Sequence, residues 1–157
     1  MRIMTQRRIV SIFLPHFAIQ RWRRRVQGPQ AVTENMPVVL ARQGPHGLLV
    51  HDVNSAAAQL GIARGERVTD MRALVPQLRV ETADEKADAA DLAMLGEWCR
   101  RWCPWTRPHE VDGLLLDTTG SDHLWGGETA MLADMRAALA GLGLTARIAI
   151  APTIGTA

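Results

Sequence analysis

No stretch of 18 or more consecutive apolar residues occurs in the sequence, so no membrane-spanning helix is expected. The first residues, MRIMTQRRIVSIF, also lack the long apolar stretch and the small-residue cleavage site of a secretory signal. Only two cysteines occur, Cys99 and Cys103, and their i, i+4 spacing in a helical pattern argues against a disulfide framework. These absences predict a soluble protein of the cytoplasm, and 157 residues with 47% apolar composition are enough for one core.

Lysine is almost missing as well. Of the 18 cationic side chains, Lys86 is the only lysine and the other 17 are arginines. Arginine suits bidentate contacts with phosphate, although a GC-rich genome would give the same bias. The net charge is only +2, but no acidic residue precedes Glu34, so the N-terminal part is strongly basic. Charge alone is consistent with contacts to nucleic acid or a partner protein, and equally with a solvated helix face. The candidate DNA-contacting residues are Arg21, Arg23, Arg24 and Arg25.

Hydrophobic periodicity divides the first half of the chain into short strands and helices. The run RRIVSIFLP (7–15) predicts a buried strand that ends at a proline. HFAIQRWRRRV (16–26) predicts a helix whose arginines face outward. Residues 36–53 predict a β-hairpin, and the helix that follows over 54–61 has Asn54 as its N-cap.

From Pro76 onward the predicted order of elements is β, α, β, β, α, β. Segment 77–82 predicts the first strand, and 83–105 predicts a long helix that stops near a proline. Two strands meet around Asp112 and Gly113, a dipeptide that favours a tight hairpin turn. An amphipathic helix and a final apolar strand complete the series. This is the ferredoxin-like order, which makes the predicted fold class α/β.

Three segments then carry a family resemblance. GIARGERVTDMRALVPQL, LLLDTTGSDHLWGGE and ARIAIAPTIGTA resemble, in this order and spacing, the palm and fingers of Y-family DNA polymerases, most closely the ImuB subgroup. The resemblance implies a ferredoxin-like βαββαβ polymerase palm formed by residues 1–27 and 76–157, with a small fingers subdomain, 28–75, inserted in it. It also implies that the chain is a fragment, because the sequence stops where the remaining helix of the palm is expected to begin.

The resemblance also assigns the positions of the catalytic metal ligands. Two divalent metals about 4 Å apart need several converging carboxylates. The Asp-x-Asp motif of the family's first strand falls on Ser11 and Phe13, and neither can replace a carboxylate as a ligand of a hard cation. The Ser-Ile-Asp-Glu hairpin motif falls on residues 110–113, where Asp112 is kept and the adjacent glutamate is replaced by Gly113. Asp112 is therefore interpreted as a remnant that suits a turn.

The family's triphosphate contacts are missing too. Active relatives carry a tyrosine and an arginine three residues apart, and Ser55 and Ala58 occupy those positions. Removing one group from a catalytic unit typically costs orders of magnitude in rate, so several losses together predict no useful polymerisation. Neither a bound metal nor another cofactor is expected.

The resemblance therefore implies a catalytically inactive homologue that acts as a DNA-associated scaffold in translesion synthesis, as part of DNA repair and damage-induced (SOS) mutagenesis. Its implied partners are DNA, the sliding clamp, an ImuA-type RecA-like protein and an error-prone replicative-type polymerase. The protein partners are expected to bind regions of the family that this chain lacks.

Several alternatives stay open. An active Y-family polymerase would hold Mg²⁺ with relocated carboxylates such as Asp117 or Asp122. Cys99 and Cys103, with histidines downstream, suggest zinc, although cysteines at this helical spacing are more typical of a packed helix. A ferredoxin-like nucleic-acid module unrelated to polymerases would need aromatic platforms on its sheet, which the predicted strands lack.

Three tryptophans, Trp98, Trp102 and Trp105, also allow two interpretations. Exposed indoles stack on nucleobases in single-strand binders, whereas buried ones would close the palm core behind the sheet. Packing is the favoured interpretation.

Overall fold

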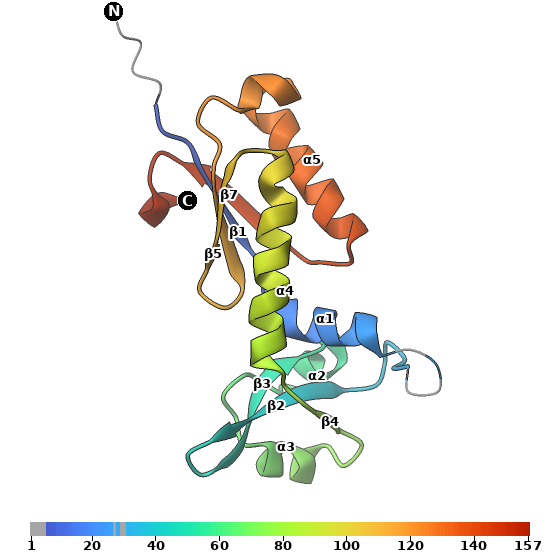
Figure 1. Cartoon of the computed structure of the whole chain (residues 1–157). Helices are drawn as coiled ribbons and strands as arrows, with labels where there is room; N and C mark the ends of the chain where they lie inside the picture. The colour runs from blue at the N-terminus through green and yellow to red at the C-terminus, as the bar shows by residue number, and fades with distance from the viewer. Residues whose placement is uncertain (1–5, 27, 29–30) are drawn as a thin grey trace, which may run out of the picture. The chain divides into compact units, whose positions relative to one another are not determined.

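The computed structural model describes residues 6–26, 28 and 31–157. The chain forms two compact units, Met1–Pro15 with Lys86–Ala157, and His16–Glu85 (Figure 1). Each unit is built around its own β-sheet. Among the described residues, no helix is both long and apolar enough to cross a membrane.

The first unit contains a four-stranded sheet in the spatial order β5-β6-β1-β7, and each neighbouring pair is antiparallel. Its strands are β1 (Ile9–Phe13), β5 (Trp105–His109), β6 (Gly113–Asp117) and β7 (Arg147–Ala151). Its helices are α4 (Glu85–Trp98) and α5 (Glu128–Gly141), with the 3₁₀ turns η2 (Cys99–Arg101), η3 (Asp122–Trp125) and η4 (Ile154–Thr156). In chain order, β1, α4, β5, β6, α5 and β7 give the ferredoxin-like βαββαβ series.

The order of elements in this unit is the predicted βαββαβ order, but a different segment forms the first strand. Segment 77–82 contains β4 (Arg79–Thr82), which lies in the other unit and pairs in parallel with β2 (Val38–Gly44). The prediction that this segment opens the palm sheet was therefore wrong. The place belongs to β1, which pairs with both β6 and β7 and so fills the centre of the sheet.

One face of the four-stranded sheet carries the core of this unit. Alternate residues of a strand share a face, and the fully buried ones on β1 and β6 are Val10, Ile12, Leu114 and Leu116. Helix α4 lies against this face. A hydrogen bond of 2.8 Å from the Thr106 hydroxyl on β5 to the Gly96 carbonyl on α4 shows this contact. Helix α5 contributes Met131, Met135 and Leu139, all fully buried. The opposite face carries the alternate residues, and the candidate site lies there.

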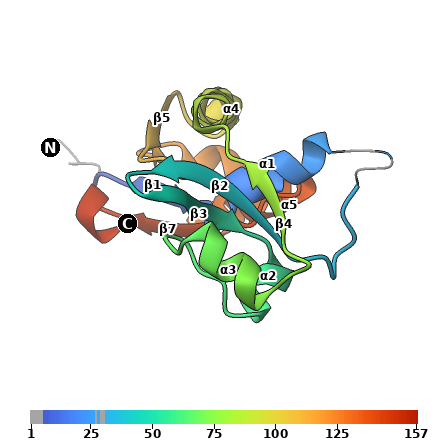
Figure 2. The same ribbon diagram turned by 90° about the horizontal axis from the view of Figure 1, so that it is seen from below.

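The second unit contains a three-stranded sheet in the order β3-β2-β4. Besides β2 and β4, its elements are α1 (Phe17–Arg25), β3 (Gly47–Val53), α2 (Ser55–Gln59) and α3 (Val68–Leu74). Helix α1 covers one face of the sheet, and α2 and α3 cover the other (Figure 2). Alternation along β2 explains this: Val38 and Leu40 pack with α1, while Val39 and Ala41 pack with α2 and α3.

Two predictions concern this unit, and the structure decides the first of them. Asn54 is the N-cap of α2, since its side-chain oxygen accepts a hydrogen bond of 2.9 Å from the Ala57 N–H, as predicted. Helix α1 groups by contacts with residues 16–85, whereas the predicted palm included residues 1–27. The functional division into a palm of 1–27 with 76–157 and fingers of 28–75 stays a prediction.

Candidate functional site

The β5–β6 hairpin carries Asp112, the one carboxylate kept at an expected metal position. His109 pairs with Gly113, so the turn consists of residues 110–112 and Gly113 is the first residue of β6. The residue with positive φ is Glu110, at 56°. The predicted turn centred on Asp112 and Gly113 is therefore displaced by one to two residues, and Gly113 does not supply left-handed backbone.

The pairing of β1 with β6 fixes which residues stand beside this turn. Phe13 lies opposite Gly113 and Ser11 lies opposite Leu115, while the Leu14 N–H donates a hydrogen bond of 2.8 Å to the Asp112 carbonyl. Of the two assigned positions, Phe13 is thus level with the hairpin motif and Ser11 is two residues further along the strand. No residue from Arg7 to Leu14 is acidic, so shifting the register could not bring a β1 carboxylate to the turn.

Gly113 stands where the family's glutamate is expected, and the backbone leaves no space for a side chain. A Cβ atom built on Gly113 would lie 2.7 Å from the His109 carbonyl oxygen. Real Cβ atoms do not approach backbone oxygen so closely, so a glutamate at this position would require the hairpin to shift.

Asp112 shares its turn with one other acidic residue, Glu110, whose side chain is exposed. Within the described ranges, no group of three or more His, Cys, Asp or Glu side chains is placed to hold a metal ion. Asp117 lies at the far end of β6, four residues from Gly113, which is about 13 Å along a strand. Metals that share a phosphoryl-transfer site are only about 4 Å apart. The residues present therefore do not fit a pair of Mg²⁺ ions.

Asp117 is instead held by hydrogen-bond donors. Its carboxylate accepts from the Thr119 hydroxyl at 2.6 Å and the Thr119 N–H at 3.2 Å, and the Arg7 Nε lies 3.3 Å away. Burial by itself would raise the pKa of Asp117, but the Thr119 hydrogen bonds and the Arg7 guanidinium outweigh it, so the pKa is lowered. These contacts point to a structural role.

The two positions assigned to the triphosphate lie on α2. Ser55 and Ala58 are both exposed, and neither side chain can hold phosphate as a phenol or guanidinium would. The nearest arginine in sequence, Arg64, is paired with Asp52: its terminal NH2 lies 2.8 Å from the carboxylate.

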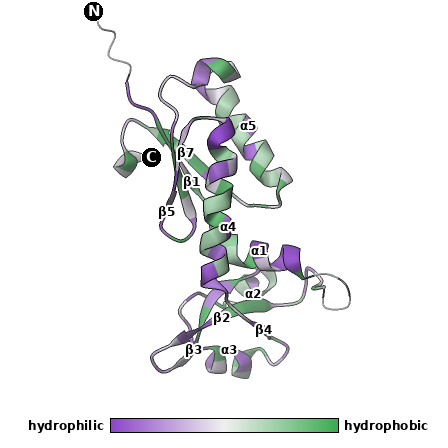
Figure 3. Cartoon of the chain, viewed as in Figure 1, coloured by the Kyte–Doolittle hydropathy of each residue, from purple (hydrophilic) through white to green (hydrophobic). Residues whose placement is uncertain are grey.

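The candidate DNA-contacting arginines on α1 do not behave as one set. Arg23, Arg24 and Arg25 are exposed at the C-terminal end of the helix, which is the hydrophilic end of α1 in Figure 3. Arg23 lies 3.7 Å from Glu34. Arg21, by contrast, is only 4% exposed, so the expectation that every arginine faces outward was wrong. Its position four residues after Phe17 places it on the buried stripe of the helix.

Both cysteines are buried, whereas the tryptophans differ in exposure. Cys99 and Cys103 are buried free thiols, and burial raises their pKa to about 12 and about 11. Such thiols are poor metal ligands and poor nucleophiles at neutral pH. Trp102 is buried, and its indole N–H donates to the Asp134 carboxylate at 2.8 Å, as packing predicted. Trp105 is 75% exposed on β5, so the packing interpretation does not hold for it.

Comparison with known proteins finds a matching family model and two similar sequences. A model of the impB/mucB/samB (IMS) family matches residues 12–157. The proteins named ImuB from two strains of Caulobacter vibrioides, NA1000 / CB15N and ATCC 19089 / CIP 103742 / CB 15, are each 48% identical over 98 residues. Those residues are 62% of this chain and 21% of each ImuB protein, so the match spans about a fifth of the relatives' length.

Solved structures resemble the chain in fold. DinB from Sulfolobus solfataricus gives a TM-score of 0.71 at 15% identity. The insertion ternary and post-insertion binary complexes of Dbh DNA polymerase give 0.73 at 16% and 0.75 at 17%. Each comparison covers 93% of this chain and 42–43% of the other. The predicted fold, a ferredoxin-like palm with an inserted fingers subdomain, is thereby confirmed.

Proposed function

Because the chain belongs to the impB/mucB/samB family of Y-family polymerases, we propose that it is a catalytically inactive homologue that serves as a DNA-associated scaffold in translesion synthesis. The observation that carries the proposal is the hairpin turn, where β1 offers Asp112 no carboxylate and a Cβ at Gly113, the position of the family's glutamate, would meet the His109 carbonyl at 2.7 Å. Glu110 lies in the same turn but is exposed, and no group of three metal-binding side chains forms among the described residues, so the several converging carboxylates of a two-metal site are not supplied there.

Primer extension on the full-length protein tests the proposed inactivity. With Mg²⁺ or Mn²⁺, all four deoxynucleotides and a primed template, we expect no product above background, and Asp112→Ala should leave that background unchanged. Dbh DNA polymerase, run in parallel, shows that the assay detects Y-family activity. Incorporation that Asp112→Ala abolishes would overturn the proposal and favour the second candidate, an active polymerase with relocated carboxylates.

That second candidate has little support in the geometry. Asp117 is the acidic residue of β6, but Thr119 and Arg7 already hold its carboxylate. Recruiting it as a metal ligand would leave the Arg7 guanidinium without its partner and would require the hairpin to bend.

We also propose that Arg23, Arg24 and Arg25 supply an electrostatic contact with DNA. Their exposure on one helix end supports this, and the burial of Arg21 removes that residue from the set. Replacing the three by alanine should weaken DNA binding and reduce the slope of log affinity against log salt by about 2 to 3. Arg136→Ala, an exposed arginine on α5, serves as the control and should change the slope by no more than about one.

The remaining partners are proposals for the whole protein. The sliding clamp, an ImuA-type RecA-like protein and an error-prone replicative-type polymerase follow from the ImuB likeness, which covers about a fifth of the ImuB chain. A cytoplasmic location and a role in damage-induced (SOS) mutagenesis rest on the same likeness. Pull-down of each purified partner by the full-length protein would test these assignments one at a time.

A further inference from the structure

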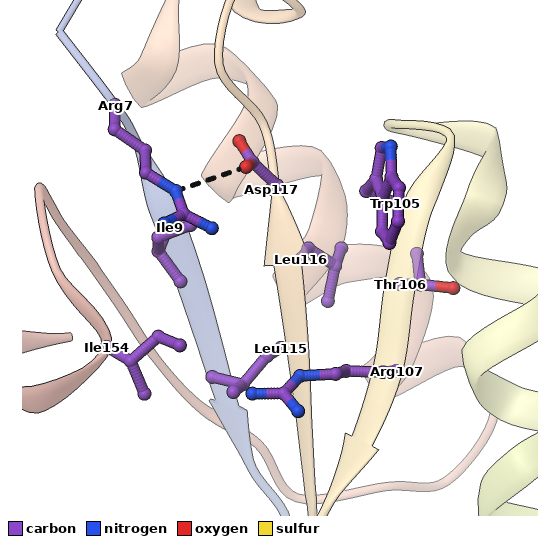
Figure 4. A pocket seen from close by; sticks show the side chains of 9 residues that line it. All are labelled: Arg7, Ile9, Trp105, Thr106, Arg107, Leu115, Leu116, Asp117 and Ile154. Carbon is purple, nitrogen blue, oxygen red and sulfur yellow. Dashed lines mark hydrogen bonds and ion pairs between the residues drawn. The ribbon is translucent and has the colours of Figure 1, made fainter.

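A hollow of about 420 Å³ lies over the four-stranded sheet, on the face opposite the helices. Figure 4 shows the side chains that line it, from β5, β6, β1 and the turn η4. The residues that define its character are Arg7, Ile9, Trp105, Arg107, Leu115 and Ile154. This volume lies within the range of about 300 to 1,000 Å³ that small-molecule pockets have.

The strand register explains why these residues meet. Trp105 pairs with Asp117, which pairs with Ile9, and Arg107 pairs with Leu115 in the next row of the same face. Because alternate residues of a strand point the same way, Trp105 and Arg107 stand side by side at the edge of the sheet. The aliphatic side chains of Ile9 and Leu115 form the floor, and Ile154 of η4 closes one side (Figure 4).

The two arginines that line the hollow differ in their ion pairs. Arg7 is balanced by Asp117, 3.3 Å away. Arg107 is exposed and forms no hydrogen bond or ion pair within the part of the chain that the structure describes. The hollow therefore offers one available guanidinium beside an apolar floor and a largely exposed indole, Trp105.

This combination fits a peptide better than a nucleic acid. A single strand of nucleic acid is held by several cationic contacts that follow its phosphates, whereas Arg107 is the one guanidinium lining this hollow that Asp117 does not already balance. One free guanidinium suits one carboxylate, which it can bind with two parallel hydrogen bonds. Tryptophan and arginine around an apolar pocket are also the side chains that dominate protein–protein binding energy.

We propose that this hollow docks an acidic peptide segment of a partner protein, with one bulky apolar side chain on the floor of Ile9 and Leu115 and a neighbouring Asp or Glu on Arg107. Docking here extends the scaffold role, and it uses residues that the inactive hairpin and the α1 arginines do not. Peptide binding and primer extension are separate measurements, so either proposal can fail without the other.

A random heptapeptide phage library selected on the purified protein tests the proposal. We expect enrichment of peptides that carry Asp or Glu next to a bulky apolar residue. The enriched peptide, synthesised with a fluorescent label, should bind at least tenfold more weakly to Arg107→Glu and to Trp105→Ala, as measured by anisotropy. Arg136→Glu carries the same charge change on α5 and should bind within about twofold of the original protein.

Three results would overturn the docking proposal. The first is a selection that enriches no acidic and apolar motif. The second is binding that both Arg107→Glu and Trp105→Ala leave unchanged. The third is a labelled oligo-dT strand that displaces the peptide and itself depends on Arg107, which would assign the hollow to nucleic acid. Circular dichroism on each variant ensures that a loss of binding is read only from folded protein.

Discussion

Asp52 and Asp112 both lie where a strand meets a turn or loop, but the first is fully buried and the second is half-buried. The Asp52 side chain is 1% exposed and accepts hydrogen bonds from the Ile19 N–H at 3.0 Å and the Val53 N–H at 2.9 Å. Arg64 donates to it as well. Asp112 is half-buried in the hairpin turn, where its backbone carbonyl accepts from Leu14.

The difference shows how to interpret an aspartate that a family likeness singles out. A carboxylate surrounded by N–H donors and a guanidinium has its charge already satisfied, and it joins elements, as Asp52 joins β3 to the first turn of α1. A metal-binding carboxylate needs other oxygen ligands facing it. Asp112 has neither an acidic residue facing it on β1 nor one at position 113, so an aspartate at this position does not by itself imply metal chemistry.

Replacing each aspartate by alanine should give the largest contrast. Asp52→Ala leaves two backbone N–H groups without an acceptor, and we expect a loss of about 2–4 kcal/mol in the free energy of unfolding. Arg64, 44% exposed, can turn to water and adds little to that loss. Asp112→Ala should cost less than about 1 kcal/mol.

Urea denaturation followed by circular dichroism measures both variants. The chain has two compact units, so the loss from Asp52→Ala should appear in the transition of the unit that contains β3. Equal losses from the two replacements would contradict the assignment of Asp52 as the structural carboxylate and Asp112 as a turn residue.

The second contrast lies between two glycines of the unit that contains the four-stranded sheet. Gly113→Ala should cost about 1–3 kcal/mol, because the added Cβ meets the His109 carbonyl oxygen at 2.7 Å. Gly141→Ala, at the end of α5, meets no atom within 4 Å and should be neutral or stabilising. Thermal unfolding of both variants checks the order. If Gly113→Ala is tolerated as well as Gly141→Ala, the hairpin can accommodate a side chain, and restoring the glutamate becomes feasible.

Much of the fold follows from local sequence pattern. The apolar run of β1, the amphipathic α5 and the Asn54 cap are set by neighbours within one or two turns, and each was predicted. The partner of β4 was not predicted, because parallel pairing with β2 joins segments about 40 residues apart and leaves no local signal.

The candidate site, too, was predictable only in part. The sequence shows that the family's other metal carboxylates are missing at Ser11, Phe13 and Gly113, but the steric reason at Gly113 depends on the position of the His109 carbonyl. The buried state of Arg21 had a signal, its spacing of four from Phe17, which the cluster of arginines around it obscured. The alternation of Trp105 with Arg107 was visible too, yet the hollow beside them forms only when β1 and η4 are added.

The smallest expected effect concerns Asp117, whose surroundings lie between those of Asp52 and Asp112. Its lowered pKa means that the ionised form favours the fold, so this stabilisation is present above the unfolded-state pKa of about 4 and is lost as the pH falls further. Asp117→Asn should therefore flatten the decrease in unfolding free energy between pH 7 and pH 3, by less than about 1 kcal/mol because the pair with Arg7 is partly exposed. Urea titrations at both pH values give the difference, and Asp112→Asn, which leaves the Arg7 and Thr119 contacts intact, is the matched control. A flattening as large in the control as in Asp117→Asn would show that the donors around Asp117 do not distinguish it from the remnant in the turn.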